Sequence, residues 1–261
     1  MLKESLMSRN QQISSLVLKR YQQTVRVSQI QADPFLQLMI AQSNSIPTNL
    51  DQSFYTPQMR QVITGWFQTI SLKMQLSGSS VVRAIYLMDR LHSPLFIVQL
   101  QRLYSWVQKQ PQFTSRGLFE AIGICVLDIA CKVEGIRAPK NFFRFLSCEP
   151  KQFLDLELKI LEALQFSVTQ YTGSDFVVEY LKQIKGVMCI EEKQVEILAN
   201  SLVISCQQQF VEVQPHIIGA IAVFKAMEKL HSKIGGMKVI SAIFYKYQIE
   251  LMDIRIMADD I

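Results

Sequence analysis

Two charged residues stand out because they lie in otherwise apolar stretches of the sequence. Lys132 follows the apolar run 121–131, and Glu157 lies among the leucines of 154–164. A charged group in such a setting must reach water, an ion partner or another protein, because burying it alone is costly. Both residues are therefore candidates for a binding function. The simpler alternative for Lys132 is a surface lysine whose stem lies along apolar neighbours and whose ammonium reaches water.

The chain carries no familiar catalytic motif. GxGxxG, GxxxxGK[ST], GxSxG and HExxH are all missing from the sequence. Carboxylate pairs such as Glu191–Glu192 are adjacent, so their side chains would not face one substrate. No histidine lies at metal-ligand spacing from a cysteine or carboxylate. We therefore expect no enzymatic activity, no metal site and no cofactor.

Composition and charge narrow the classes of partner and cellular compartment that remain possible. The formal net charge of +5 comes from scattered lysines and arginines, whereas a nucleic-acid partner usually requires a concentrated basic stripe. The five cysteines form no CxxC pair, which favours buried free thiols in a reducing compartment. No signal peptide or apolar stretch of about 20 residues is visible. We expect a protein of the nucleus or cytoplasm, with no nucleic-acid or membrane partner.

Helix is the dominant structural signal, and the sequence predicts an all-α fold. Apolar residues recur three and four positions apart, as on one face of an α-helix, while period-two alternation is rare. Prolines and glycines separate the periodic segments. The expected helices are 3–28, 34–43, 57–75, 78–92, 94–109, 116–134, 139–146, 150–166, 174–185, 191–208, 214–231 and 237–258.

The sequence also indicates a division into an N-terminal extension and two domains. Residues 43–53 are rich in Asn, Ser, Pro and Thr and predict a linker. A weak internal repeat, in which 121–130 resembles 217–226, suggests two related halves, although chance similarity between two buried helices is the alternative. We predict an N-terminal extension over 1–50, a first domain over 51–168 and a second domain over 169–261.

Four segments, in this order and spacing, resemble the cyclin box. Residues 59–67 (MRQVITGWF) are similar to its MRxxLxxW helix, and 84–91 (AIYLMDRL) to its helix that ends in Asp-Arg. Residues 128–134 (DIACKVE) are similar to its Ala-Ser-Lys-x-Glu element, and 156–166 (LELKILEALQF) to the next helix with its Leu-x-Phe ending. The chain is thus identified as a member of the cyclin family, closely over about 50–170 and loosely beyond.

The resemblance implies two tandem five-helix cyclin folds with a preceding N-terminal helix. It also implies a regulatory subunit that binds and activates a cyclin-dependent serine/threonine kinase, in cell-cycle control. In the family, the residues matching Lys132 and Glu157 grip the kinase's regulatory helix. The residues matching Arg60 and Asp89 form a structural ion pair, whereas two unconnected surface charges are the alternative here.

Two further surfaces follow from the resemblance. Residues Phe143, Phe145 and Leu146 match part of the family's kinase interface, although core packing explains them equally well. A groove for Arg-x-Leu substrates or inhibitors would be formed by Met59, Val62, Ile63 and Trp66. This groove departs from the family pattern because Thr69 replaces an acidic residue and Gly65 stands where Asp is common. Glu120 is the candidate replacement charge, and a simple core role is the alternative for Trp66.

Three other functions remain open at this stage. A transcription-associated cyclin fold that binds DNA or polymerase would carry clustered basic residues. A helical scaffold would purify without a kinase, and an enzyme would show turnover as an isolated chain. The sequence does not specify which kinase is bound.

Overall fold

The computed structural model describes residues 33–44, 55–114, 117–136, 146–185, 192–209, 213–230 and 234–247, together with 249, 254 and 257. Within these residues the regular secondary structure is entirely helical, so the all-α prediction is confirmed. None of the helices described is long and apolar enough to cross a membrane. The elements are α2 (Pro34–Asn44), α3 (Pro57–Met74), α4 (Gly78–Leu91), the 3₁₀ helix η1 (Pro94–Phe96), α5 (Ile97–Gln108), α6 (Pro111–Thr114), α7 (Leu118–Val133), α9 (Pro150–Ala163), α10 (Gly173–Lys185), α11 (Glu192–Gln209), α12 (Pro215–Leu230) and α13 (Ile234–Lys246).

Local capping explains where several helices begin. The Thr56 hydroxyl accepts a hydrogen bond from the backbone N–H of Met59 at 3.2 Å, and Pro57 occupies the first turn of α3. The Ser77 hydroxyl accepts one from Ser80 N–H in the same way at the start of α4. These side chains satisfy backbone donors that have no partner inside the helix. The signals are local, which is why the predicted starts of α3 and α4 agree with the structure.

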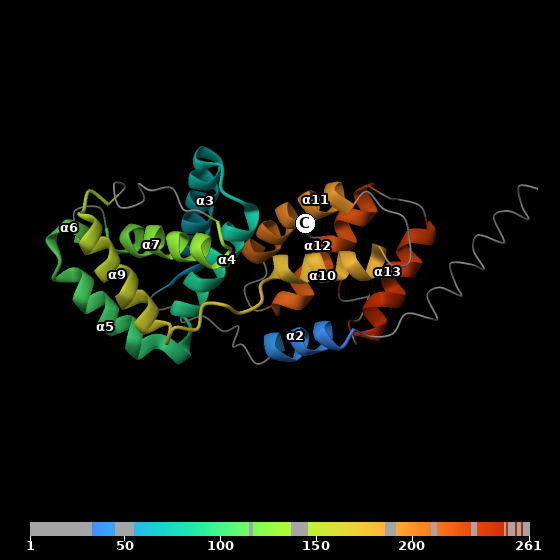
Figure 1. Cartoon of the computed structure of the whole chain (residues 1–261), viewed down its shortest axis with the longest axis horizontal. Helices are drawn as coiled ribbons and strands as arrows, with labels where there is room; N and C mark the ends of the chain where they lie inside the picture. The colour runs from blue at the N-terminus through green and yellow to red at the C-terminus, as the bar shows by residue number, and fades with distance from the viewer. Residues whose placement is uncertain are drawn as a thin grey trace, which may run out of the picture.

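The helices form two groups that lie side by side along the long axis of the molecule (Figure 1). In the first group, α7 is the central helix, and all its residues from Ala121 to Cys131 are buried. Helices α4, α5, α6 and α9 contact it, and side chains of α3 approach it at Gly123. An apolar helix enclosed on all sides anchors the group, because its burial removes a large apolar surface from water.

The second group is built around α12, which packs against α10, α11, α13 and α2. Close approach of α10 depends on Gly219, because a Cβ there would lie 2.7 Å from the Cβ of Phe176. Gly123 plays a comparable part in α7, where a Cβ would lie 3.1 Å from Trp66. The two segments of the predicted repeat are therefore the two central helices. The division into two tandem five-helix folds stays a prediction.

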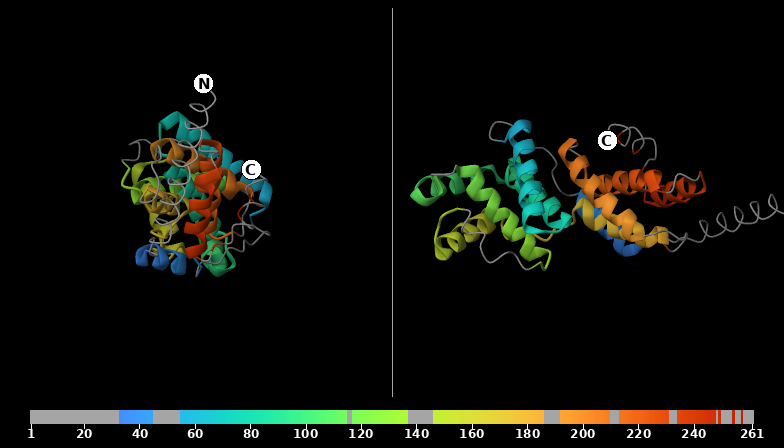
Figure 2. Two further views of the ribbon diagram at one scale, coloured as in Figure 1. Left: turned by 90° about the vertical axis from the view of Figure 1, so that its right-hand side faces the viewer. Right: turned by 90° about the horizontal axis from the view of Figure 1, so that it is seen from above.

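Helix α2 corrects the predicted linker. Ser43, at which the predicted helix 34–43 and the predicted linker 43–53 overlap, lies in α2 and is completely buried. Its hydroxyl is 2.8 Å from Nδ1 of His216 in α12. Residues from the predicted N-terminal extension thus pack on a helix near the end of the chain, and the view from above in Figure 2 shows α2 beside that group.

Other sequence-based helices differ from the structure in smaller ways. The segment expected as one helix over 94–109 is divided into η1 and α5, and the short helix α6 was not predicted. The expected helices 3–28 and 139–146 lie outside the described residues. Cys125, Cys131, Cys148 and Cys206 are buried and form no disulfide with one another.

The buried imidazole of His216 should make the stability of the second group depend on pH. Burial lowers the pKa of His216 to about 4, against an ordinary value of 6.5. Between these values the unfolded chain binds a proton that the folded chain does not bind, so stability falls as the pH falls. From pH 7 to pH 5 we expect a loss of roughly 2 kcal/mol from this residue.

Urea unfolding at both pH values, for the natural chain and a His216→Gln variant, measures this loss. Other groups titrate in the same range, so the quantity to compare is the pH-dependent change in each protein. The change should be smaller in the variant by about the stated amount. Equal changes in the two proteins would contradict the assignment.

Candidate functional site

Lys132 and Glu157 meet where the end of α7 crosses the middle of α9. The ammonium Nζ of Lys132 donates to both carboxylate oxygens of Glu157, at 2.6 and 2.7 Å. The same nitrogen lies 2.9 Å from Oδ2 of Asp128, one turn earlier in α7. The structure thus brings the two sequence-predicted residues together and adds Asp128, which the sequence analysis did not consider.

The three side chains of this cluster differ in exposure. The Lys132 side chain is 47% exposed, whereas those of Glu157 and Asp128 are 13% and 7% exposed. The ammonium therefore lies over two carboxylates and faces solvent. Two carboxylates against one ammonium leave a formal charge of −1, which can take a further hydrogen-bond donor from a partner.

Burial and hydrogen bonding both shift the pKa values of this cluster. Removal from water raises the pKa of Asp128, although Lys132 opposes this effect. For Lys132, desolvation acts to lower the pKa, but the hydrogen bonds to Asp128 and Glu157 outweigh it and the net pKa is raised. Lys132 therefore stays positively charged at neutral pH. The position near the C-terminus of α7 also favours a cation.

Exposed leucines border the charged cluster on α9. Leu154 is 58% exposed and Leu158 is 47% exposed, while Phe153, Leu156 and Ile160 form the buried face of the same helix. Residues three and four apart on a helix are surface neighbours, so Leu154 lies next to both Glu157 and Leu158. A charged centre bordered by apolar side chains is a common arrangement at protein–protein interfaces.

The other residues predicted for the kinase interface are Phe143, Phe145 and Leu146. Phe143 and Phe145 lie outside the described residues. Leu146 is only 1% exposed and belongs to the hydrophobic core. Its predicted role in an interface is therefore wrong, and the core alternative holds, because a completely buried side chain cannot contact a partner.

Arg60 and Asp89 form a bidentate pair between α3 and α4. Nε and Nη2 of Arg60 donate to the two Asp89 oxygens at 2.8 and 2.7 Å. Arg60 Nη1 also donates to the backbone oxygen of Gln208 in α11, at 3.3 Å. Burial acts to lower the pKa of Arg60, but Asp89 outweighs it and the net pKa is raised. The pair is largely buried, so its two members depend on each other.

The predicted docking groove is only partly a surface. Val62 is 72% exposed and Met59 and Trp66 are half-buried, but Ile63 is 6% exposed and lies in the core. Ile63 is therefore not available for docking, which corrects the prediction for that residue. Glu120 is exposed, and it lies three positions before Gly123, the residue that Trp66 approaches. Glu120 thus lies about one helical turn from the position that Trp66 approaches.

Comparison with known proteins identifies the family. The model of the cyclin N-terminal domain matches residues 35–169, which is more than half of the 261 residues. This chain belongs to the cyclin family. The match begins inside α2 and ends after α9, so it includes every described residue of the Lys132 cluster and of the Arg60–Asp89 pair.

Individual cyclins are distant relatives of this chain. Cyclin-A2-1 of Arabidopsis thaliana is 23% identical over 221 residues, which cover 82% of this chain and 44% of that protein. Cyclin-B1-1 of Oryza sativa subsp. japonica is 28% identical over 175 residues, covering 65% and 35% respectively. Cyclin-A1 of Homo sapiens is 22% identical over 171 residues, covering 64% and 33%. The chain spans less than half the length of these relatives.

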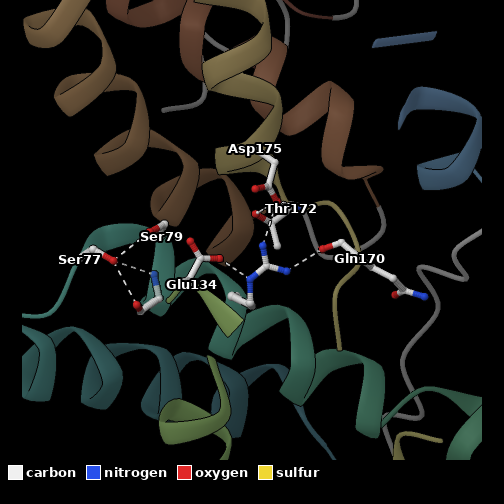
Figure 3. Close-up of polar contacts among 8 residues, drawn as sticks. Ser77, Ser79, Glu134, Gln170, Thr172 and Asp175 are labelled. Carbon is white, nitrogen blue, oxygen red and sulfur yellow. Dashed lines mark hydrogen bonds and ion pairs between the residues drawn. The ribbon is translucent and has the colours of Figure 1, made fainter. Parts of the chain in front are cut away.

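Sequence reasoning missed Arg83, which joins the two helix groups of this cyclin. Arg83 lies in α4 and is 6% exposed. Its Nε pairs with Glu134 after α7, Nη1 donates to the backbone oxygen of Gln170 at 2.7 Å, and Nη2 donates to Asp175 of α10 at 3.2 Å. Figure 3 shows Glu134, Gln170 and Asp175 converging on this guanidinium. An arginine within the run Val81–Leu87 was the signal that could have indicated it.

Removal of Arg60 should destabilise this cyclin strongly. Arg60→Ala leaves the Asp89 carboxylate in a buried site without its partner, at a cost of about 3–5 kcal/mol. The double variant Arg60→Ala/Asp89→Asn removes the stranded charge and should recover part of the loss. The free energy of unfolding in urea measures both changes.

Lys159→Ala is the matched control, because Lys159 forms an exposed ion pair with Glu162. Exposed pairs contribute about 0–1 kcal/mol, so this variant should unfold almost as the natural chain does. If Arg60→Ala cost no more than Lys159→Ala, the structural role of the pair would be wrong.

Proposed function

We propose that this cyclin is a non-catalytic regulatory subunit that binds and activates a cyclin-dependent serine/threonine kinase, in cell-cycle control in the nucleus or cytoplasm. Membership of the family supports this function. The observation that carries it is the cluster of Lys132, Asp128 and Glu157, held at the junction of α7 and α9 with its ammonium facing solvent.

The cluster is suited to holding the end of a partner's helix. The exposed Lys132 ammonium can donate to backbone carbonyl oxygens, and the Glu157 carboxylate can accept from backbone N–H groups. Leu154 and Leu158 offer apolar area beside these charges. Because α7 is enclosed by other helices, the cluster is positioned before the partner arrives, which reduces the entropic cost of binding.

Activation follows if the bound helix is the kinase's regulatory helix. Drawing that helix inward completes the Lys–Glu ion pair of the kinase and releases its activation loop. The cyclin thereby stabilises one of the conformations that the kinase already samples. No phosphoryl transfer by the cyclin itself is involved.

Loss of Glu157 should weaken kinase binding more than it weakens the fold. In Glu157→Ala, Lys132 retains its contact with Asp128, so the free energy of unfolding should change little. Kinase affinity should fall at least tenfold, because the variant lacks the carboxylate that accepts from the partner. Lys132→Ala should lose affinity as well and also lose stability, since it strands Asp128. Binding and activation are measured with a panel of purified cyclin-dependent kinases.

The exposed pair of Lys159 and Glu162 provides matched controls on the same helix. Lys159→Ala and Glu162→Ala remove the same residue types from α9 outside the cluster, and both should bind and activate kinase normally. Normal activation by both Lys132→Ala and Glu157→Ala would show that the kinase uses another surface. Purification of the chain from its own cells without any kinase would favour a helical scaffold instead.

We also propose that substrates or inhibitors with Arg-x-Leu motifs dock on Met59, Val62, Trp66 and Glu120. The exposure of Val62, at 72%, and the nearby carboxylate of Glu120 favour this second role. The apolar residues would take the leucine, and Glu120 would attract the arginine. Trp66 itself packs against Gly123, so Trp66→Ala would disturb the fold and is a poor test.

Val62→Ser and Glu120→Lys should each weaken binding of a fluorescein-labelled Arg-x-Leu peptide at least threefold, as measured by fluorescence anisotropy. Both residues are exposed, so the fold should be retained. Val98→Ser changes another exposed valine, in α5, and serves as the control. Unchanged peptide binding in both test variants would exclude this docking surface.

A further inference from the structure

A cleft of about 810 Å³ opens between the two helix groups, and its described lining includes no residue of the Lys132 cluster or of the Trp66 surface. The second half of α3 and the beginning of α4 form one wall, and α10 and α11 form the other. Figure 3 shows Ser77, Ser79, Glu134 and Asp175, which line this cleft, in one neighbourhood. Cavities of this size between two packed units commonly receive ligands or peptide segments.

The lining of the cleft is acidic although the chain as a whole is basic. Glu134, Asp175 and Glu196 line it, and no lysine, arginine or histidine is among the described lining residues. Arg83, which is not among the lining residues, pairs with Glu134 and Asp175. Three carboxylates against one guanidinium leave a formal charge of −2, on a chain whose net charge is +5. The cleft therefore attracts cations.

Exposed apolar side chains from three helices also line the cleft. Leu72 of α3 is 82% exposed, Ile197 of α11 is 64% exposed and Val178 of α10 is 37% exposed. Large apolar side chains this exposed, gathered on facing elements, often mark an interaction site. A small inorganic cation would make no use of them, so the occupant must itself present apolar groups.

Polar atoms at the wall point to a polypeptide. Ser174 Oγ and Asn200 Oδ1 are buried, line the cleft and have no hydrogen-bond partner among the described residues. Ser174 as a whole is 4% exposed. Buried polar atoms in native proteins are nearly always paired. The regularly spaced N–H and C=O groups of an extended peptide are suited to complete such pairs.

We propose that this cleft binds a short segment of a partner protein in which a lysine or arginine lies next to isoleucine- or leucine-type residues. The basic side chain meets Glu196 and the carboxylates held by Arg83, and the apolar residues pack against Leu72 and Ile197. The segment contacts both helix groups at once. This site is separate from the surface proposed for the kinase, and its occupation does not require the kinase.

A peptide array tests the proposal with the full chain. The array holds matched sets of 12-residue peptides, all without Arg-x-Leu spacing: one basic and apolar, one with glutamate for the basic residues, and one with serine for the apolar residues. The natural chain should bind the basic–apolar set at least fivefold more than either other set. Glu196→Lys and Ile197→Ser should each remove this preference; Ile197 is exposed and Glu196 is half-buried on α11.

Val62→Ser is the matched control, because it removes an exposed apolar side chain from the other docking surface, and it should keep the preference. The proposal is overturned if the natural chain shows no preference, or if the preference survives both Glu196→Lys and Ile197→Ser. It is also overturned if Val62→Ser removes the preference equally. Because no kinase is present, failure here leaves the kinase proposal unaffected.

Discussion

The enclosure of α7 is the constraint on which the rest of the structure depends. Its residues from Ala121 to Cys131 are all buried, so the helix can occupy only one position among α3, α4 and α9. Its last turn then places Lys132 against α9, and the residue after the helix, Glu134, reaches Arg83. The hydrophobic effect acting on one helix thus positions both the candidate binding cluster and the connection between the helix groups.

The ion pairs of this cyclin differ in how far their side chains are exposed to solvent. The buried and the exposed pairs therefore differ in what they can do. Arg60 and Arg83 are almost completely buried, and each has bidentate or multiple partners, as a planar guanidinium allows. Such groups cannot be removed singly without leaving a charge in the interior. The Lys132 side chain is about half exposed, so it can exchange or add partners at modest cost. A guanidinium inside the protein therefore serves the fold, whereas a half-exposed lysine side chain stays open to further partners.

Sequence patterns predicted the helices well where the deciding interactions are local. Capping by Thr56 and Ser77 and apolar periodicity depend on residues within one or two turns, so the starts of α3 and α4 were predictable. The composition that follows Ser43 suggests a linker, whereas Ser43 itself is buried against His216, 173 positions further along. The family resemblance placed Ile63 in a docking groove and left Leu146 open between an interface and the core, because sequence patterns do not show which helix covers a given face.

By itself the sequence determined the all-α class, the membership of the cyclin family and the residues able to carry charge inside apolar helices. Helix periodicity and short motifs record these properties directly, since they depend on near neighbours. Only the tertiary structure decided which charges meet: Lys132 with Glu157 across 25 positions, and Arg83 with Asp175 across 92. It also decided that an acidic, apolar cleft lies between the groups. Such contacts arise when separate helices pack, and their geometry depends on the whole core rather than on any one segment.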